Sequence, residues 1–164
     1  MGRRAPGGPC PISSSIGVAH MRYMIPAVEA AAIWARSAAD GDGAMIGDKA
    51  FLAGLGRMLM QIEAACATPG PMGRIKGADV AIANSEQLID LVGPQAVLPY
   101  GTDGTIANGA IEAAHRAVQV TATYGGTNEV FRTIIAQHHL GLPRPDYPGR
   151  KVFLAGDRPA TAAA

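Results

Sequence analysis

Apolar residues recur along the chain at steps of three and four, the spacing that places them on one face of an α-helix. One stretch shows the pattern clearly, with Leu52, Leu55, Leu59 and Ile62 on a single stripe. No segment alternates between apolar and polar residues for long enough to predict a strand. The pattern therefore predicts five helices, over residues 15–39, 47–67, 77–92, 106–122 and 127–139.

Glycine and proline mark where these helices end. Residues 69–71 read Pro-Gly-Pro and should stop the second helix, and Gly93 followed by Pro94 should stop the third. Pro26 lies inside the first predicted helix. Because proline removes a backbone donor and crowds the preceding turn, we expect Pro26 to kink that helix or split it in two.

Helices that each carry one apolar stripe must bury those stripes against one another. The sequence therefore predicts an all-α, up-and-down helical bundle of four to five helices. The bundle is expected to span residues 13–142. Residues 1–12 are rich in proline and glycine and are predicted to be a flexible N-terminal segment, and residues 143–164 a C-terminal tail.

Composition narrows the classes of function. The chain has 164 residues, 14 Lys+Arg against 13 Asp+Glu, and a net charge of +1, so no basic surface for nucleic acid is expected. No apolar run approaches the length of a membrane span, so no membrane association is expected. Two cysteines, Cys10 and Cys66, do not make a disulfide scaffold, which favours a cytoplasmic protein.

The four histidines do not have the spacing of a metal site. His138 and His139 are adjacent, so their side chains diverge on a helix and are expected to act as cations near its C-terminus. His20 and His115 are isolated in the sequence and are expected at the core edge or the surface.

A pair of glycines precedes the fifth helix. Gly125 and Gly126 allow backbone conformations that other residues avoid, and they permit close approach of a ligand. Free N–H groups at the start of the helix, with the side chains of Thr127 and Asn128, offer a place for an anion or a polar ring edge. A tight turn between two helices explains the same residues, so both interpretations stay open at this point.

The sequence around these glycines resembles the C-terminal signature of acyl-CoA dehydrogenases. The resemblance rests on Tyr124-Gly125-Gly126-Thr127-Asn128-Glu129-Val130, then Arg132, Ile135-Ala136 and Leu140-Gly141. Weaker similarity extends upstream to Ser14-Ser15-Ile16-Gly17, Ile62-Glu63-Ala64, Ser85-Glu86 and Leu91-Val92-Gly93-Pro94. It covers residues 13–145 and implies the C-terminal helical domain of that family.

The resemblance implies an FAD-dependent oxidation of an acyl-CoA substrate. In the family a carboxylate removes the α-proton of the thioester while the β-hydride passes to the flavin, which gives the 2,3-enoyl-CoA. Carried over by position, Thr127, Asn128 and Glu129 are the FAD-contacting residues, and Gly126 lies near the thioester. The acyl chain is left open: short, branched or steroid-derived.

This sequence differs from the family at the position of the catalytic base. The position that many members fill with the catalytic glutamate is Gly125, which cannot accept a proton. No catalytic residue is therefore assigned. Glu29 and Glu63 are the helical glutamates before the break at residues 69–71, and exposed helix charges are the favoured interpretation of both. Arg132 matches a recurrent family arginine, with an ion pair as the alternative.

The family builds its site from three domains, and this sequence resembles one of them. Two hypotheses follow. The chain is a C-terminal domain or fragment of an acyl-CoA dehydrogenase that is inactive alone, or it is a non-catalytic helical partner subunit of a heteromeric dehydrogenase. Both hypotheses predict a homo- or hetero-oligomer with dehydrogenase subunits.

Overall fold

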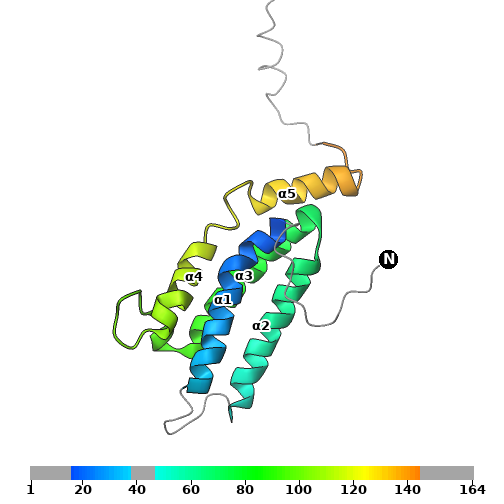
Figure 1. The fold of residues 1–164 in the computed structure, drawn as a ribbon. Helices are drawn as coiled ribbons and strands as arrows, with labels where there is room; N and C mark the ends of the chain where they lie inside the picture. Colours follow the sequence, from blue (N-terminus) through cyan, green and yellow to red (C-terminus); the bar gives the residue numbers. More distant parts are fainter. Residues whose placement is uncertain (1–15, 38–46, 145–164) are drawn as a thin grey trace, which may run out of the picture.

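The computed structural model describes residues 16–37 and 47–144, and it confirms the all-α prediction. Within these ranges every regular element is helical (Figure 1). Residues 1–12, most of the tail and Cys10 lie outside the described residues. The main helices are α1 (Ile16–Ser37), α2 (Lys49–Ala67), α3 (Gly70–Val92), α4 (Ala110–Val118) and α5 (Asn128–Ile134), which continues as a π-helix, η5 (Ile135–His139).

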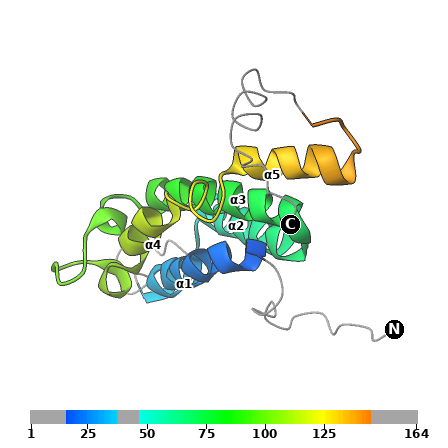
Figure 2. The same cartoon turned by 90° about the horizontal axis from the view of Figure 1, so that it is seen from above.

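Helices α1 to α4 form the bundle, and α3 contacts each of the other main helices. The apolar stripes meet in one core, whose largest members are Met21, Met24, Val28, Phe51, Met58, Ile62, Leu88, Ile111 and Val118. Helix α5 lies across one end of the bundle and packs against α3 (Figures 1 and 2). The end covered by α5 is where the glycine pair is placed.

Helix α1 runs through Pro26 as one helix, so the predicted split is wrong. Pro26 is exposed, and the carbonyl group that loses its helical donor can therefore be hydrated. Burial of α1 residues on both sides of the proline, including Met24 and Val28, holds the two halves of the helix against the same core.

Two predicted boundaries also differ from the structure. Helix α3 begins at Gly70 rather than at residue 77, with Pro71 in its first turn, where a missing N–H costs nothing. The predicted helix over 106–122 is shorter and is preceded by a 3-10 turn, η4 (Ile106–Gly109). Ala107 and Asn108 have positive φ values of 44° and 55°, which an α-helix does not allow. A second 3-10 turn, η3 (Pro94–Val97), follows α3.

Helix α2 is, by length and composition alone, the one described helix that is apolar enough to cross a membrane. Core helices of globular proteins pass the same test. In the bundle its inner face is buried, through Phe51, Leu55, Met58, Ile62 and Ala65.

Candidate functional site

The glycine pair forms a tight turn between α4 and α5, referred to below as the Gly-Gly turn (residues 124–127). Gly125 and Gly126 have φ values of 69° and 102°, in the left-handed region that favours glycine. Thr127 is the N-cap of α5, because its side chain accepts a hydrogen bond from the backbone N–H of Val130 at 3.3 Å.

Arg74 of α3 holds the Gly-Gly turn from inside the bundle. Its side chain is only 1% exposed, and Nη2 donates to the carbonyl oxygens of Tyr124 at 2.6 Å and Gly126 at 3.3 Å. The guanidinium also lies 5.8 Å from the ring of Tyr124 and 5.4 Å from that of Phe131. The described residues form ion pairs only at Arg116 and Arg132, so Arg74 is a buried cation held by carbonyl and ring dipoles.

The direction of these carbonyl groups determines where the amide donors of the turn point. All peptide bonds in the described residues are trans, and in a trans peptide the C=O and N–H groups point in opposite directions. The carbonyls of Tyr124 and Gly126 face Arg74. The N–H groups of Gly125 and Thr127 therefore point away from Arg74. The turn offers two outward donors for an oxygen atom of a ligand.

His20 of α1 completes the buried side of the turn. Its ring is 1% exposed, and Nδ1 lies 3.3 Å from the hydroxyl oxygen of Tyr124. Burial lowers the pKa of His20 to about 4, with smaller contributions from the positive charges of Arg74 and Arg22. His20 is thus neutral in the folded chain at neutral pH, as its position beside a buried cation requires.

Stability should therefore fall as the pH falls from about 6.5 to about 4. In this range the unfolded chain binds a proton at His20 and the folded chain does not, which favours the unfolded state by about 3 kcal/mol at the acid end. Urea unfolding of the chain and of His20→Asn over this range measures the difference. His139→Asn, at an exposed histidine, should keep the dependence. Equal pH dependence in wild type and His20→Asn would contradict the prediction.

Asn128 fastens α5 to α3. It is 5% exposed, its Nδ2 donates to Oδ1 of Asp79 at 2.9 Å, and its backbone N–H donates to the carbonyl oxygen of Ala122 at 3.1 Å. Oδ1 of Asn128 is buried without a hydrogen-bond partner. The side chain of Asn128 therefore faces the bundle rather than the open side of the turn.

The other predicted site residues lie on the open side. Thr127 is half-buried, and Glu129 is exposed and pairs with Arg132 at 3.2 Å. The backbone N–H of Glu129 and the hydroxyl of Thr127 lower the pKa of the Glu129 carboxyl, with a smaller effect from Arg132. The assignment of Gly126, Thr127, Asn128 and Glu129 to substrate and cofactor stays a prediction.

Gly125 has room for a side chain. A Cβ built there meets nothing within 4 Å, so the missing glutamate leaves open space rather than a filled pocket. Glu29 and Glu63 are exposed, and neither contributes to the hydrogen bonds of the Gly-Gly turn. Within the described ranges no three His, Cys, Asp or Glu side chains are grouped to hold a metal ion.

Sequence reasoning missed Arg74, although a signal was present. The predicted stripe of the third helix contains Ala78 and Ala81, and one helical turn earlier the same stripe reaches Arg74. An arginine on an apolar stripe indicates a buried cation that serves a particular contact. Because α3 was predicted to begin at residue 77, this extension was not made.

The family comparison agrees with the geometry. The family described as "Acyl-CoA dehydrogenase, C-terminal domain" matches residues 14–140, which is most of the chain. The chain belongs to the acyl-CoA dehydrogenase family. This confirms the resemblance inferred from the motif that contains the Gly-Gly turn, and it assigns the helical bundle to the C-terminal domain of acyl-CoA dehydrogenases.

Individual acyl-CoA dehydrogenases are similar over part of their length. "Acyl-CoA dehydrogenase FadE26" of Mycobacterium tuberculosis is 37% identical over 71 residues, which are 43% of this chain and 18% of that protein. Two solved structures share the fold: the ChsE4-ChsE5 complex of Mycobacterium tuberculosis (TM-score 0.65, 24% identity) and the "Tcur3481-Tcur3483 steroid ACAD" (TM-score 0.67, 21% identity). The chain covers 36% of each of these two chains, and they cover 76% and 79% of it.

Proposed function

We propose that this chain supplies the C-terminal helical part of an FAD-dependent acyl-CoA dehydrogenase, which oxidises an acyl-CoA thioester to the 2,3-enoyl-CoA, and that it is inactive alone. One observation carries the proposal: Gly125 stands where many members of the family carry the glutamate base, in a turn that Arg74 holds with its donors outward. These two features support a role in binding without a role as the proton acceptor.

The residues of the Gly-Gly turn fit a nucleotide cofactor. Gly125 carries no side chain and has open space beside it, so a flat ring or a phosphate could reach the backbone there, whereas the ring of Phe131 fills the corresponding space at Gly126. The N–H groups of Gly125 and Thr127, which point away from Arg74, would be the donors to such a ligand. Gly126, Thr127 and Glu129 would border the ligand, and Asn128 would fix the helix behind it. FAD, when bound, supplies the acceptor for the β-hydride.

The remaining chemistry of the site requires another polypeptide segment. Removal of the α-proton needs a carboxylate held against the Cα–H group, and among the described residues no carboxylate lies within 4 Å of a Cβ built at Gly125. The chain spans only 18% of the curated relative and 36% of each similar structure. We infer that the base and most of the acyl-CoA tunnel come from the rest of a longer chain or from a second protein.

A partner-subunit role is the second candidate. The solved structures with this fold are named as pairs of proteins, ChsE4 with ChsE5 and Tcur3481 with Tcur3483. In that case the chain is a base-less helical subunit of a hetero-oligomer with dehydrogenase subunits. The two candidates differ in whether the isolated chain retains flavin.

Gel filtration of the purified chain after incubation with FAD separates the candidates. A yellow species at the elution volume of the chain supports direct participation in flavin binding. A colourless chain that elutes with a co-expressed dehydrogenase subunit, and makes that subunit yellow, supports the partner role. Turnover of acyl-CoA by the isolated chain with an artificial electron acceptor would contradict both.

Gly125→Glu is expected to restore a proton acceptor at a modest cost in stability. The Cβ has open space, so the cost is the positive φ of 69° for a residue with a side chain, about 1 kcal/mol. In a complex that binds FAD, the variant should increase acyl-CoA oxidation, whereas Gly125→Gln, of equal size, should not. Equal rates for the two variants would show that this position does not serve as the base.

A further inference from the structure

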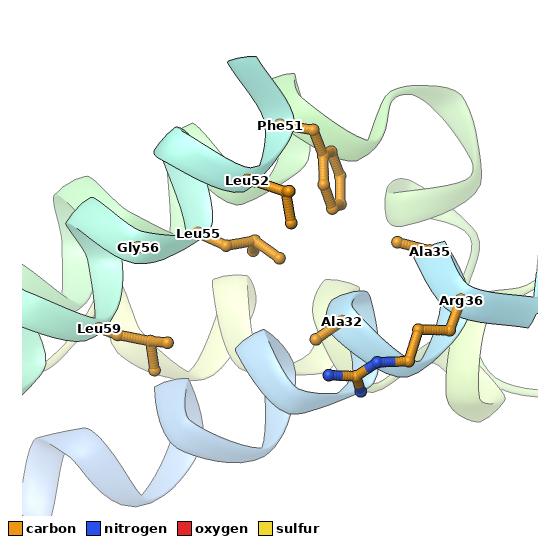
Figure 3. A pocket seen from close by; sticks show the side chains of 8 residues that line it. All are labelled: Ala32, Ala35, Arg36, Phe51, Leu52, Leu55, Gly56 and Leu59. Carbon is orange, nitrogen blue, oxygen red and sulfur yellow. The ribbon is translucent and has the colours of Figure 1, made fainter. Parts of the chain in front are cut away.

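A groove of about 240 Å³ lies between α1 and α2 (Figure 3). Helix α2 forms one wall with Leu52, Leu55 and Leu59, and α1 forms the other wall with two alanines and Arg36. The alanines are small, which leaves the space that the leucines border. None of the lining residues contributes to the hydrogen bonds that hold the Gly-Gly turn, so the groove is separate from the site described above.

The apolar wall on α2 is open to solvent although its residues are large. Leu52 and Leu59 are 46% and 49% exposed, and Gly56 lies between them, where an added Cβ would meet nothing within 4 Å. Exposed apolar surface in a concave site is typical of a binding site for an apolar group, because contact with that group releases water from both surfaces. The groove therefore suits an apolar ligand that enters from solvent.

Among the described residues that line the groove, Arg36 is the only charged one. Its side chain runs back along α1 toward Ala32, so the guanidinium lies at the edge of the apolar walls (Figure 3). The ion pairs between described residues involve Arg116 and Arg132, so no described carboxylate neutralises Arg36. A guanidinium binds a carboxylate through two parallel N–H donors. Arg36 thus favours a ligand with a carboxylate at one end of its apolar part.

The shape of the groove favours a straight chain. Leu52, Leu55 and Leu59 follow one another along α2, so this wall runs along the helix axis for about 10 Å. A cavity of about 150 Å³ holds benzene, so the groove accommodates roughly ten carbon atoms. Carbon atoms placed in a line along one helix correspond to an unbranched chain rather than to a compact ring system.

We propose that the groove between α1 and α2 binds an unbranched fatty acid of medium length in its free form, with the carboxylate at Arg36 and the alkyl chain along Leu52, Leu55 and Leu59. Charge separates this ligand from the acyl-CoA thioester of the proposed function, because the carbonyl group of a thioester is neutral and offers Arg36 no carboxylate. The inference does not rest on the proposed function, since it requires only the residues of the groove.

Titration of the full chain with octanoate tests the proposal. We expect saturable binding to one site per chain in calorimetry, at octanoate concentrations below those at which micelles form. Hexanoate has two methylene groups fewer and should bind about tenfold more weakly, because each buried methylene contributes to the affinity. The neutral analogue 1-octanol should also bind about tenfold more weakly, since it lacks the charge that pairs with Arg36.

Arg36→Met separates the charge from the apolar contact. Methionine keeps a long apolar side chain, so the variant should lose about tenfold in affinity for octanoate and keep its affinity for 1-octanol. Arg57→Met is the matched control, because Arg57 is an exposed arginine of α2 that does not line this groove. It should bind both ligands as wild type does.

Gly56→Met tests the location of the ligand. The added side chain has open space and would occupy the groove, so the variant should fold and should lose the binding of both octanoate and 1-octanol. Ala53→Met is the matched control, because it introduces the same side chain at an exposed position of α2 outside the groove. Its affinity for both ligands should equal that of wild type.

Absence of saturable octanoate binding to wild type, equal losses in Arg36→Met and Arg57→Met, or full binding by Gly56→Met would overturn the proposal. Changes in backbone amide chemical shifts that map to the Gly-Gly turn instead of α1 and α2 would also overturn it, because they would place the fatty acid at the proposed acyl-CoA site. Flotation with lipid vesicles without binding of soluble octanoate would overturn it and assign the groove to a membrane surface. Retention of FAD, which tests the proposed function, is independent of all these outcomes.

Discussion

Replacing Arg74 by alanine is expected to lower the free energy of unfolding by about 3 kcal/mol. The change removes the buried donor to the carbonyl oxygens of Tyr124 and Gly126 and leaves a cavity where a fully buried side chain lay. Relief of the desolvation cost of a buried guanidinium offsets part of this loss. The net effect remains large because two carbonyl groups lose a charged partner together.

Two further substitutions separate the loss of the hydrogen bonds from the loss of side-chain volume. Arg74→Met fills most of the volume but donates no hydrogen bond, so it isolates the contribution of the carbonyl contacts. Arg74→Lys keeps the charge with a compact donor and should lose about half as much stability. Urea unfolding at neutral pH measures all three variants. If Arg74→Met were as stable as wild type, the carbonyls of the turn would not depend on the arginine.

The two variants that remove the charge, Arg74→Ala and Arg74→Met, should change the titration of His20. The positive charge of Arg74 is one cause of the lowered pKa of His20, after burial itself. Without that charge the pKa of His20 is expected to rise, though not to its ordinary value, because the ring stays buried. An NMR titration of the His20 ring in Arg74→Met tests this, with His115 and His139 as internal references for the fold.

The sequence pattern was sufficient to predict the class of fold and the family. Apolar periodicity is a local property, and α2 and α5 follow it because each has one buried or half-buried stripe. The start of α3 was mispredicted because Gly70, Pro71 and Gly73 are poor helix residues by propensity. Packing against α1 and α2 outweighs that preference, and packing is not visible in a short window of sequence.

The site was predictable only on its exposed side. Gly125, Gly126 and Thr127 are contiguous, so a motif could identify them. Arg74 and His20 reach the turn from positions 50 and 104 residues away from Tyr124, and only the folded bundle brings them together. Asn128 belongs to the motif, but the motif does not determine where its side chain points. Its contact with Asp79 in α3 turns the side chain toward the core.

Gly73→Ala should be the most disruptive single methyl added to the described chain. A Cβ at this position would lie 2.0 Å from the carbonyl oxygen of Thr68 and 2.9 Å from its carbonyl carbon. Both atoms belong to the backbone, so no side-chain rotation relieves the overlap. We expect a loss of about 4 kcal/mol in the free energy of unfolding, at the upper end of the range for point mutations.

The linker between α2 and α3 cannot simply move aside. Thr68 is fixed on one side by its hydroxyl, which donates to the carbonyl oxygen of Ala64 at 2.7 Å, and by its backbone N–H, which donates to that of Ala65 at 3.3 Å. On the other side the N–H of Gly73 donates to the carbonyl oxygen of Pro69 at 3.2 Å. Opening the linker to admit a methyl group would break at least one of these contacts.

Gly47→Ala provides the matched control, since it makes the same chemical change where a Cβ meets nothing within 4 Å, and it should alter stability by less than about 0.5 kcal/mol. Gly73 adjoins Arg74, so a shift of the first turn of α3 should also loosen the Gly-Gly turn. In that case Gly73→Ala and Arg74→Met together should cost less than the sum of their separate effects in urea unfolding. Strict additivity would show that α3 accommodates the methyl without moving the arginine, and that the α2–α3 linker and the Gly-Gly turn are less coupled than their contacts indicate.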